Sequence, residues 1–254
     1  MVSTRGHPKD FPEPDLTPSR TSTPSRLTSR TSSSKAGGKW AHQISNVTLV
    51  WLGISLPLVA WDTGYVLLRP HSMPGGSLHW PLWVPYELYG KIDYIYGWKA
   101  FDEHNGFTAA QGALNAVESA MYLYYLYIMY AYGKRVGSGR TSAKRSSDAR
   151  GFFAQRSIEG RYGAVAALVV YTAAIMTLSK TVLYWLNEYF SGFENIGHNT
   201  VIDLVFMWII PNGAWLVLPT YIIYEVGGEL LESLSKAAGA SGPVPDDTIV
   251  VKRD

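Results

Sequence analysis

The chain has 254 residues and a formal net charge of +2, which is too small to indicate a nucleic-acid partner. It contains no cysteine, so nothing in it requires an oxidising compartment, a thiolate or a cysteine-based metal site. The mean hydropathy of -0.01 averages a polar beginning and long apolar runs. Runs of about 20 apolar residues span a bilayer, and they outweigh the one or two soluble domains that this length would allow.

Residues 1–40 form a polar segment rich in Ser, Thr, Pro and Arg. Such a composition cannot bury enough apolar surface to fold, so the segment is predicted to be a disordered tail. It has no apolar stretch of the kind found in secretory signal peptides. The first apolar run is therefore expected to insert the chain into the membrane by itself.

Four apolar runs follow, each long enough for a membrane-spanning helix. They are predicted at about residues 41–68, 107–132, 162–190 and 201–224. Pro57, Pro211 and Pro219 lie inside the first and last runs, where a proline kinks a helix. The runs are too long and continuous for the alternating strands of a membrane barrel. The predicted fold is all-α: a polytopic four-transmembrane-helix bundle over residues 41–228, followed by a C-terminal tail over residues 229–254.

Lysine and arginine gather on one side of this predicted bundle. The tail before the first run and the loop between the second and third runs are rich in both, whereas the loop after the third run carries Glu194 and neither Lys nor Arg. Because cytosolic loops carry the excess of positive charge, the tail and the middle loop are predicted to be cytosolic. Four spans return the C-terminus to the same side. The long aromatic loop over residues 69–106 is expected to lie at the opposite surface as a cap.

Polar side chains inside the apolar runs are candidates for function, because they are costly at membrane depth. The candidates are Asp62, Gln111, Asn115, Glu118, Tyr122, Lys180, Tyr184, Asn187, Asp203, Asn212 and Trp215. Steps of four, three and four residues place the four candidates of the second run on one helix face. Polar groups also hold spans together, and for a single amide that structural role is the expectation. Asp203 is expected to be an ordinary helix-end residue, whereas Glu118 lies near the middle of its run.

Acid, amide and indole groups together favour proton transfer over hydrolysis. A carboxyl group in an apolar cavity can stay protonated at neutral pH and give its proton to a weakly basic group. A tryptophan face can stabilise the cation that forms when an alkene is protonated. The sequence contains no nucleophile–His–acid set, no Gly-rich phosphate loop and no His-x-x-x-His pair. No metal and no cofactor is therefore expected.

Three stretches resemble the EXPERA family, which includes the emopamil-binding proteins (sterol isomerases) and the sigma-two receptor. Residues 212–219, Asn-Gly-Ala-Trp-Leu-Val-Leu-Pro, are similar to the last-helix motif whose Asn and Trp line the sterol pocket. Residues 182–188 and the following Gly192–Phe193 and Gly197–His198 pairs are similar to the end of the third helix and its loop. Residues 105–108 followed by Glu118 resemble the start of the second helix and its catalytic Glu. The resemblance extends over about residues 51–225.

The resemblance implies a four-helix fold in the endoplasmic reticulum membrane, a sterol-sized pocket and, often, a homodimer. The first helix departs from the sterol isomerases, because Thr63 and Val59 stand where those enzymes have Glu and His. Asp62 and Asp102 are more similar to the two acids of the sigma-two receptor. The Arg- and Ser-rich tails and the sequence Trp-Asp-Thr-Gly-Tyr resemble a filamentous-fungal branch, in which such proteins can serve specialised metabolism.

Two main functions remain open at this stage. The first is a membrane-embedded isomerase, or a cyclase derived from one, that transfers a proton at a C=C bond of a sterol or terpenoid-like substrate. Glu118 would give the proton, Asp62 would be the partner base, Asn212 would orient a group and Trp215 would face the cation. The predicted substrate-binding residues are Gln111, Asn115, Tyr122, Lys180, Tyr184 and Asp102.

The second function is a non-catalytic sterol or lipid binder resembling the sigma-two receptor, which the missing histidine favours. A transporter or channel is a weaker third alternative, because the four runs show no inverted repeat. In each case the expected partners are a hydrophobic small molecule and the lipid bilayer.

Overall fold

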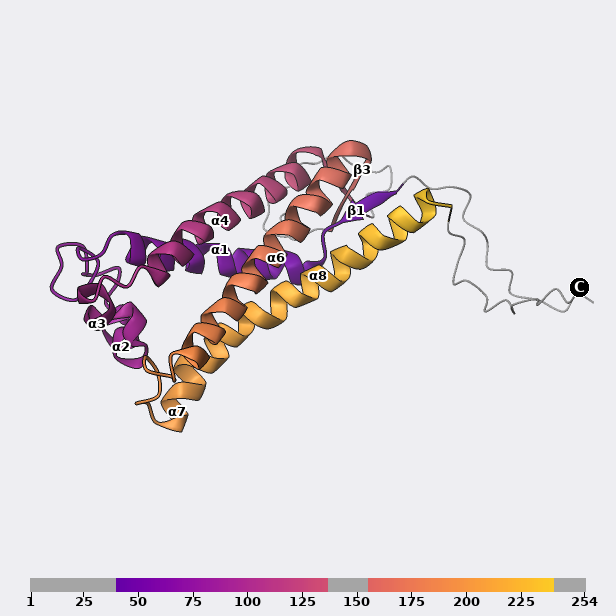
Figure 1. Ribbon diagram of the computed structural model, residues 1–254. Helices are drawn as coiled ribbons and strands as arrows, with labels where there is room; N and C mark the ends of the chain where they lie inside the picture. Colours follow the sequence, from indigo (N-terminus) through magenta and orange to yellow (C-terminus); the bar gives the residue numbers. More distant parts are fainter. Residues whose placement is uncertain (1–39, 137–154, 240–254) are drawn as a thin grey trace, which may run out of the picture. The chain divides into compact units, whose positions relative to one another are not determined.

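The computed structural model describes residues 40–136 and 155–239 (Figure 1). The tail predicted to be disordered, most of the basic middle loop and residues 240–254 lie outside this part of the chain. The described residues are mostly helical, with three short strands, and this confirms the all-α class. Each predicted apolar run contains one long helix, although the helices differ from the predictions at several ends.

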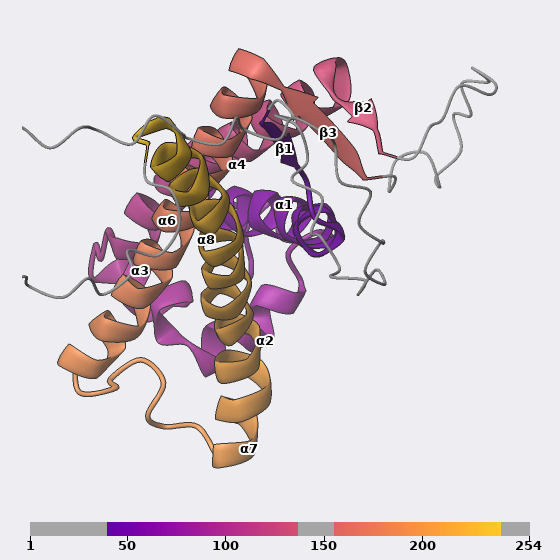
Figure 2. The same cartoon turned by 90° about the vertical axis from the view of Figure 1, so that its right-hand side faces the viewer.

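The long helices are α1 (Asn46–Leu67), α4 (Phe107–Tyr132), α6 (Gly160–Phe190) and α8 (Ile210–Ala237). Helix α4 packs between α1 and α6, and α8 lies along α6 (Figures 1 and 2). Helices α1 and α8 touch each other little. Helix α8 is preceded by α7 (Val201–Asp203) and by a π-helical turn, η2 (Leu204–Ile209). Such turns occur frequently at functional sites.

Within the described ranges, three helical segments are long and apolar enough to cross a membrane: Asn46–Leu67, Gly160–Phe190 and Val201–Ala237. Helix α4 has the predicted bounds but is not among them. Its polar stripe and its many tyrosines interrupt the apolar sequence, and no stretch of it reaches the hydropathy of a membrane span. The first, third and fourth predicted spans thus have the expected membrane character, and the second stays a prediction.

The helix predicted from residue 41 begins five residues later, at Asn46. Residues Ala41–Gln43 instead form strand β1, which pairs antiparallel with β3 (Arg156–Glu159). Strand β3 also pairs with β2 (Lys134–Arg135) in a sheet of order β1-β3-β2. Ser45 accepts the backbone N–H of Thr48 through its side chain and so caps the start of α1. The pairing of β1 with β3 and the Ser45 cap explain why the apolar run is not helical from its beginning.

The far end of α8 also differs from the prediction, because the helix continues to Ala237 instead of ending near residue 224. The additional turns are polar on one side, and Lys236 pairs with Glu232 four residues earlier. A helix therefore occupies the beginning of the segment predicted as a C-terminal tail. Pro211 lies at the start of α8, directly after the π-helical turn η2, and thus inside the continuous helical segment Val201–Ala237.

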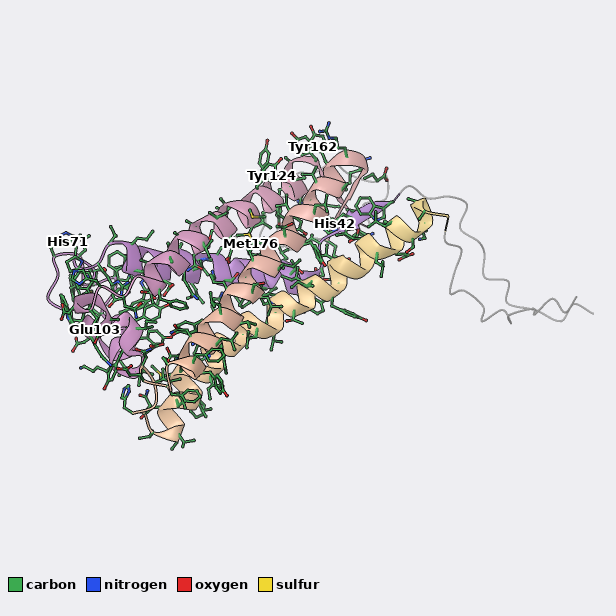
Figure 3. The ribbon with its side chains drawn as sticks, viewed as in Figure 1. His42, His71, Glu103, Tyr124, Tyr162 and Met176 are labelled. Atoms are coloured by element: carbon green, nitrogen blue, oxygen red, sulfur yellow. The ribbon has the colours of Figure 1, made fainter. Side chains whose placement is uncertain are left out.

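The aromatic loop over residues 69–106 folds into α2 (Pro85–Ile92), the 3-10 turn η1 (Tyr94–Tyr96) and α3 (Trp98–Asp102). It contacts the end of α1 closely: Tyr86 stacks on Tyr65 with ring centroids 3.8 Å apart, and the Trp61 indole donates to the Leu82 carbonyl. We call residues 69–106 the aromatic cap. Figure 3 shows His71 and Glu103 of the cap at one end of the helices, and His42 of β1 toward the other.

A candidate active site between the helices and the aromatic cap

A cavity of about 380 Å³ lies where α1, α4, α6 and the start of α8 meet the aromatic cap. Its volume is in the range typical of sites for small organic ligands. Seven of the predicted site residues line it: Asp62, Gln111, Asn115, Lys180, Tyr184, Asn212 and Trp215. The cap contributes three tyrosine side chains, and most of the remaining wall is apolar. The structure therefore brings most of the predicted polar residues to one aromatic cavity.

Asp62 presents a carboxylate to the cavity from the last third of α1. The Tyr86 hydroxyl donates to its Oδ1 over 2.7 Å, and the Asn115 amide donates to its Oδ2 over 3.5 Å. Burial and the neighbouring Asp62 raise the pKa of Tyr86, so this tyrosine remains a protonated donor. No lysine or arginine in the described ranges forms an ion pair with Asp62.

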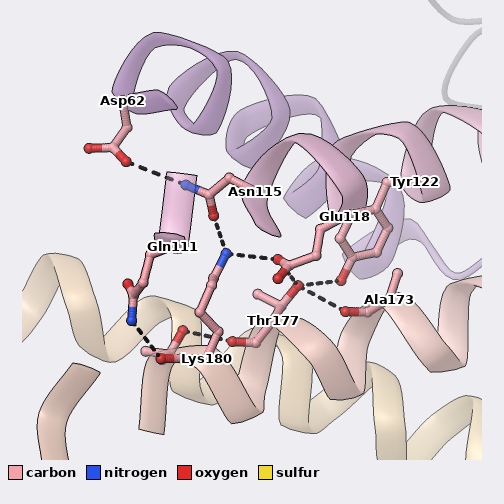
Figure 4. A network of polar contacts seen from close by, with 9 residues as sticks. Asp62, Gln111, Asn115, Glu118, Tyr122, Ala173, Thr177 and Lys180 are labelled. Atoms are coloured by element: carbon pink, nitrogen blue, oxygen red, sulfur yellow. Dashed lines mark hydrogen bonds and ion pairs between the residues drawn. The ribbon is translucent and has the colours of Figure 1, made fainter. Parts of the chain in front are cut away.

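Glu118 and Lys180 form a buried ion pair beside Asp62. The Lys180 Nζ lies 3.0 Å from Glu118 Oε2, and the two side chains are only 9% and 5% exposed. The same ammonium donates to the Asn115 Oδ1 (Figure 4). Lys180 lines the cavity whereas Glu118 does not. The group predicted to give a proton to the substrate is therefore held behind the lysine.

Two hydroxyl groups extend this pair away from the cavity. Thr177 Oγ1 donates to Glu118 Oε2 over 2.9 Å, and the Tyr122 hydroxyl lies 3.2 Å from the same Thr177 oxygen (Figure 4). The Ala173 carbonyl oxygen also lies 2.9 Å from Thr177 Oγ1. Since the single Thr177 proton goes to one of these two acceptors, Tyr122 is the donor to Thr177. Tyr122 does not line the cavity. In the structure Tyr122 supports Glu118 through Thr177. The predicted contact between Tyr122 and the substrate would require these side chains to move.

Asn212 and Trp215, the two residues of the last-helix motif in α8, line the cavity and make different contacts with the rest of the protein. The Asn212 amide donates to the Trp208 carbonyl over 2.9 Å. Trp215 packs edge-on against Trp51 with ring centroids 4.9 Å apart. The remaining predicted residue, Asp102, is exposed on α3 and does not line the cavity. The structure does not bring Asp102 together with the other candidates.

Asp93 is a buried acid that the sequence reasoning did not select. It is fully buried in the cap and accepts hydrogen bonds from the Tyr184 hydroxyl, the Trp208 indole over 2.9 Å and the Ile95 amide over 3.1 Å. Burial raises its pKa to about 6, although the Tyr184 hydrogen bond opposes the shift. The nearby Glu188 carboxylate adds to it. Asp93 thus connects the cap to α6 and η2 at the edge of the cavity, where its partner Tyr184 lines the wall.

The raised pKa of Asp93 predicts how stability depends on pH. The carboxyl titrates near 3.8 when unperturbed, so the native state binds the proton more tightly than the unfolded chain. The free energy of unfolding should therefore fall as the pH rises from about 4 to about 6. Asp93→Asn should remove this part of the pH dependence, which amounts to roughly 3 kcal/mol.

Thermal unfolding of the detergent-purified protein at a series of pH values measures this effect. The comparison concerns the slope, because the amide also replaces one acceptor oxygen and changes the absolute stability. Asp102→Asn, at an exposed site, is the matched control and should keep the wild-type slope. Parallel pH profiles for wild type and Asp93→Asn would show that Asp93 does not titrate in this range.

A scan against protein-family models finds no match for this chain, and a search of curated proteins finds no significant match.

Proposed function

We propose that this protein is a membrane-embedded isomerase that transfers a proton at a C=C bond of a sterol or terpenoid-like substrate. The observation that carries the proposal is Asp62. It is a carboxylate in the wall of an aromatic cavity, oriented by Tyr86 and Asn115, and none of the described residues forms an ion pair with it. A carboxylate held in this way can take a proton from one carbon and return it to another.

The surroundings of Asp62 suit such a substrate. The cavity is large enough for a ligand of drug size, and its aromatic and aliphatic walls favour a rigid hydrophobic molecule. In the proposed site Asp62 takes up the proton and returns it. Glu118 holds the ammonium of Lys180 in place beside Asp62. Trp215 offers an aromatic face to the ligand, and Asn212 lies on the same wall. Glu118 acts on the substrate through Lys180, because the cavity reaches the lysine and not the acid.

We also propose that the protein belongs to the EXPERA family and lies in the endoplasmic reticulum membrane. In this proposal α4 is a fourth membrane span. Asn212 and Trp215, which carry the most specific part of the resemblance, both line the cavity. Helix α4 packs between α1 and α6, two of the three apolar helices, which supports its placement inside the membrane with them. In this arrangement the aromatic cap faces the lumen and both termini face the cytosol.

Glycosylation mapping tests this orientation. An acceptor site placed in the loop over residues 191–199 should be modified, since the luminal side carries the oligosaccharide transferase. One placed at residues 140–145 should stay unmodified, and so should the natural Asn46-Val47-Thr48 sequence at the start of α1. A mobility shift on gels, reversed by a glycosidase, reports the modification. Modification of Asn46 would reverse the proposed orientation.

Product analysis tests the enzymatic activity. Membranes containing the protein are incubated with sterols and terpenoids that differ in the position of one double bond. We expect a product of unchanged mass with the double bond shifted, and none from membranes that carry Asp62→Asn. Equal product formation by wild type and Asp62→Asn would show that Asp62 has no part in the reaction, and would contradict the proposal.

A further inference from the structure

The ammonium group of Lys180 has an unused hydrogen-bond donor at the cavity. An ammonium has three N–H groups. Two of them meet Asn115 Oδ1 and Glu118 Oε2, and the third has no partner in the described part of the chain. Lys180 lines the cavity, and its side chain is 9% exposed. Since buried donors are nearly always paired, a water or a ligand atom in the cavity completes this set, and a ligand oxygen can take the place of the water.

Asn115 holds this donor and the base Asp62 on the same wall. Its amide oxygen accepts from Lys180 Nζ, while its amide nitrogen lies 3.5 Å from Asp62 Oδ2 (Figure 4). One side chain of α4 therefore spaces a carboxylate of α1 from an ammonium of α6. A ligand that contacts both groups offers a proton donor to the first and an acceptor to the second. For the proposed isomerase, these are an acidic C–H and an oxygen.

The charges of the site favour a neutral acceptor. Asp62 and Glu118 bring two carboxylates, against the ammonium of Lys180 and the guanidinium of Arg69, whose charge also acts on Asp62. With these charges balanced, a carboxylate ligand would add an uncompensated negative charge to a buried site, which is unfavourable. A ketone adds no charge, and its oxygen is a good acceptor for an N–H donor.

Resting on the proposed isomerase function, we propose that the substrate is a ketone whose C=C bond is one carbon removed from the carbonyl, with its oxygen bound to Lys180. Asp62 removes a proton from the carbon between the carbonyl and the double bond. The C–H electron pair forms a dienolate, and the negative charge passes from Asp62 to the substrate oxygen. The protonated Asp62 then returns the proton to the far end of the former double bond. The product is the conjugated ketone, and both the site and the substrate regain their initial charge.

In this pathway the ammonium of Lys180 lies next to the substrate oxygen on which the negative charge develops. The total charge of the site stays constant during the step, because the negative charge moves from Asp62 toward the ammonium. A donor fixed at a developing oxyanion typically accelerates such reactions by about 10² to 10³-fold. A carbocation pathway would instead create positive charge near the same ammonium. The position of Lys180 therefore selects the enolate pathway for this cavity.

A steroid whose first rings form a naphthol tests the oxygen site without turnover. Its ionised form absorbs and fluoresces differently from the neutral form, so the spectrum of the bound ligand reports how strongly the site stabilises an oxyanion. Lys180→Met alone would leave Glu118 unpaired and risks unfolding the protein. The double variant Glu118→Gln, Lys180→Met removes the pair together. Lys99→Met, at an exposed site outside the cavity, is the control.

We expect the wild type and Lys99→Met to bind the naphthol largely ionised, with its proton transferred to Asp62 so that the total charge of the site stays constant. The double variant should lower the ratio of ionised to neutral ligand at least tenfold. The wild type should also convert the unsaturated ketone at least about 10² times faster than the alcohol with the same double bond. Identical naphthol spectra in wild type and double variant would overturn the inference.

Equal rates for ketone and alcohol would also overturn it, while leaving the isomerase proposal standing. Lys180-dependent ionisation of the naphthol, without conversion of any ketone, alcohol or hydrocarbon, would support the oxygen site and overturn the isomerase.

Discussion

Replacing Asp62 with Asn is expected to lower kcat by at least about 10²-fold, the usual scale for loss of a general base. The amide keeps the shape of the side chain and can still accept the Tyr86 hydroxyl through its oxygen, but it cannot take a proton from carbon. The affinity for a neutral hydrophobic ligand should change little, since the apolar walls are unaltered. Turnover and ligand binding are measured on the same detergent-purified samples.

Asp102→Asn is the matched control, because Asp102 is also acidic but lies exposed outside the cavity. It should leave both turnover and binding at the wild-type level. If Asp62→Asn instead abolishes the binding of cationic amphiphiles and there is no turnover to lose, Asp62 is a counter-charge for a bound amine. The non-catalytic binder would then be the better description.

Glu118→Gln is expected to lower both stability and turnover. Removing one partner of a buried ion pair leaves the other charge uncompensated, which typically destabilises a protein by about 3–5 kcal/mol. Lys180 would also lose the anion that holds its Nζ in place beside Asn115. We expect turnover to fall by roughly 10²-fold, as for loss of a group that positions a donor at the reacting atoms.

The double variant Glu118→Gln, Lys180→Met separates the two effects. It removes both charges, so the apparent Tm should return toward that of the wild type, while turnover of the ketone should remain low. Thr177→Val is a milder companion, because it leaves both charges of the ion pair and removes the hydroxyl that bonds to Glu118 and Tyr122. Wild-type turnover in Glu118→Gln would show that the ion pair has no part in the reaction.

The long helices could be predicted because a membrane-length apolar run leaves few alternatives. The bounds of α4 follow from local signals: Asn105 accepts the Phe107 N–H at its start, and Gly133 follows its end. The strands could not be predicted in this way. Strand β3 pairs with β1 and β2 across long stretches of sequence, and none of the three shows a pattern of its own.

The candidate site was partly predictable for a similar reason. Helical spacing shows that Asn115 and Glu118 share a face of α4, and that Lys180 and Tyr184 share a face of α6. It does not show which faces meet, so the pairing of Glu118 with Lys180 and its place behind the lysine appear only in three dimensions. Asp93 was missed because its partners Tyr184 and Trp208 lie 91 and 115 residues away.

The most direct test of the central claim measures product formation and ligand binding together on purified wild-type protein. The sample is offered sterols and terpenoids, including ketones with an isolated double bond, and is analysed for isomers of unchanged mass. If the protein is an isomerase, at least one bound compound is converted to the isomer with a shifted double bond. Tight binding of such compounds without conversion of any of them would contradict the isomerase and identify a lipid-binding protein instead.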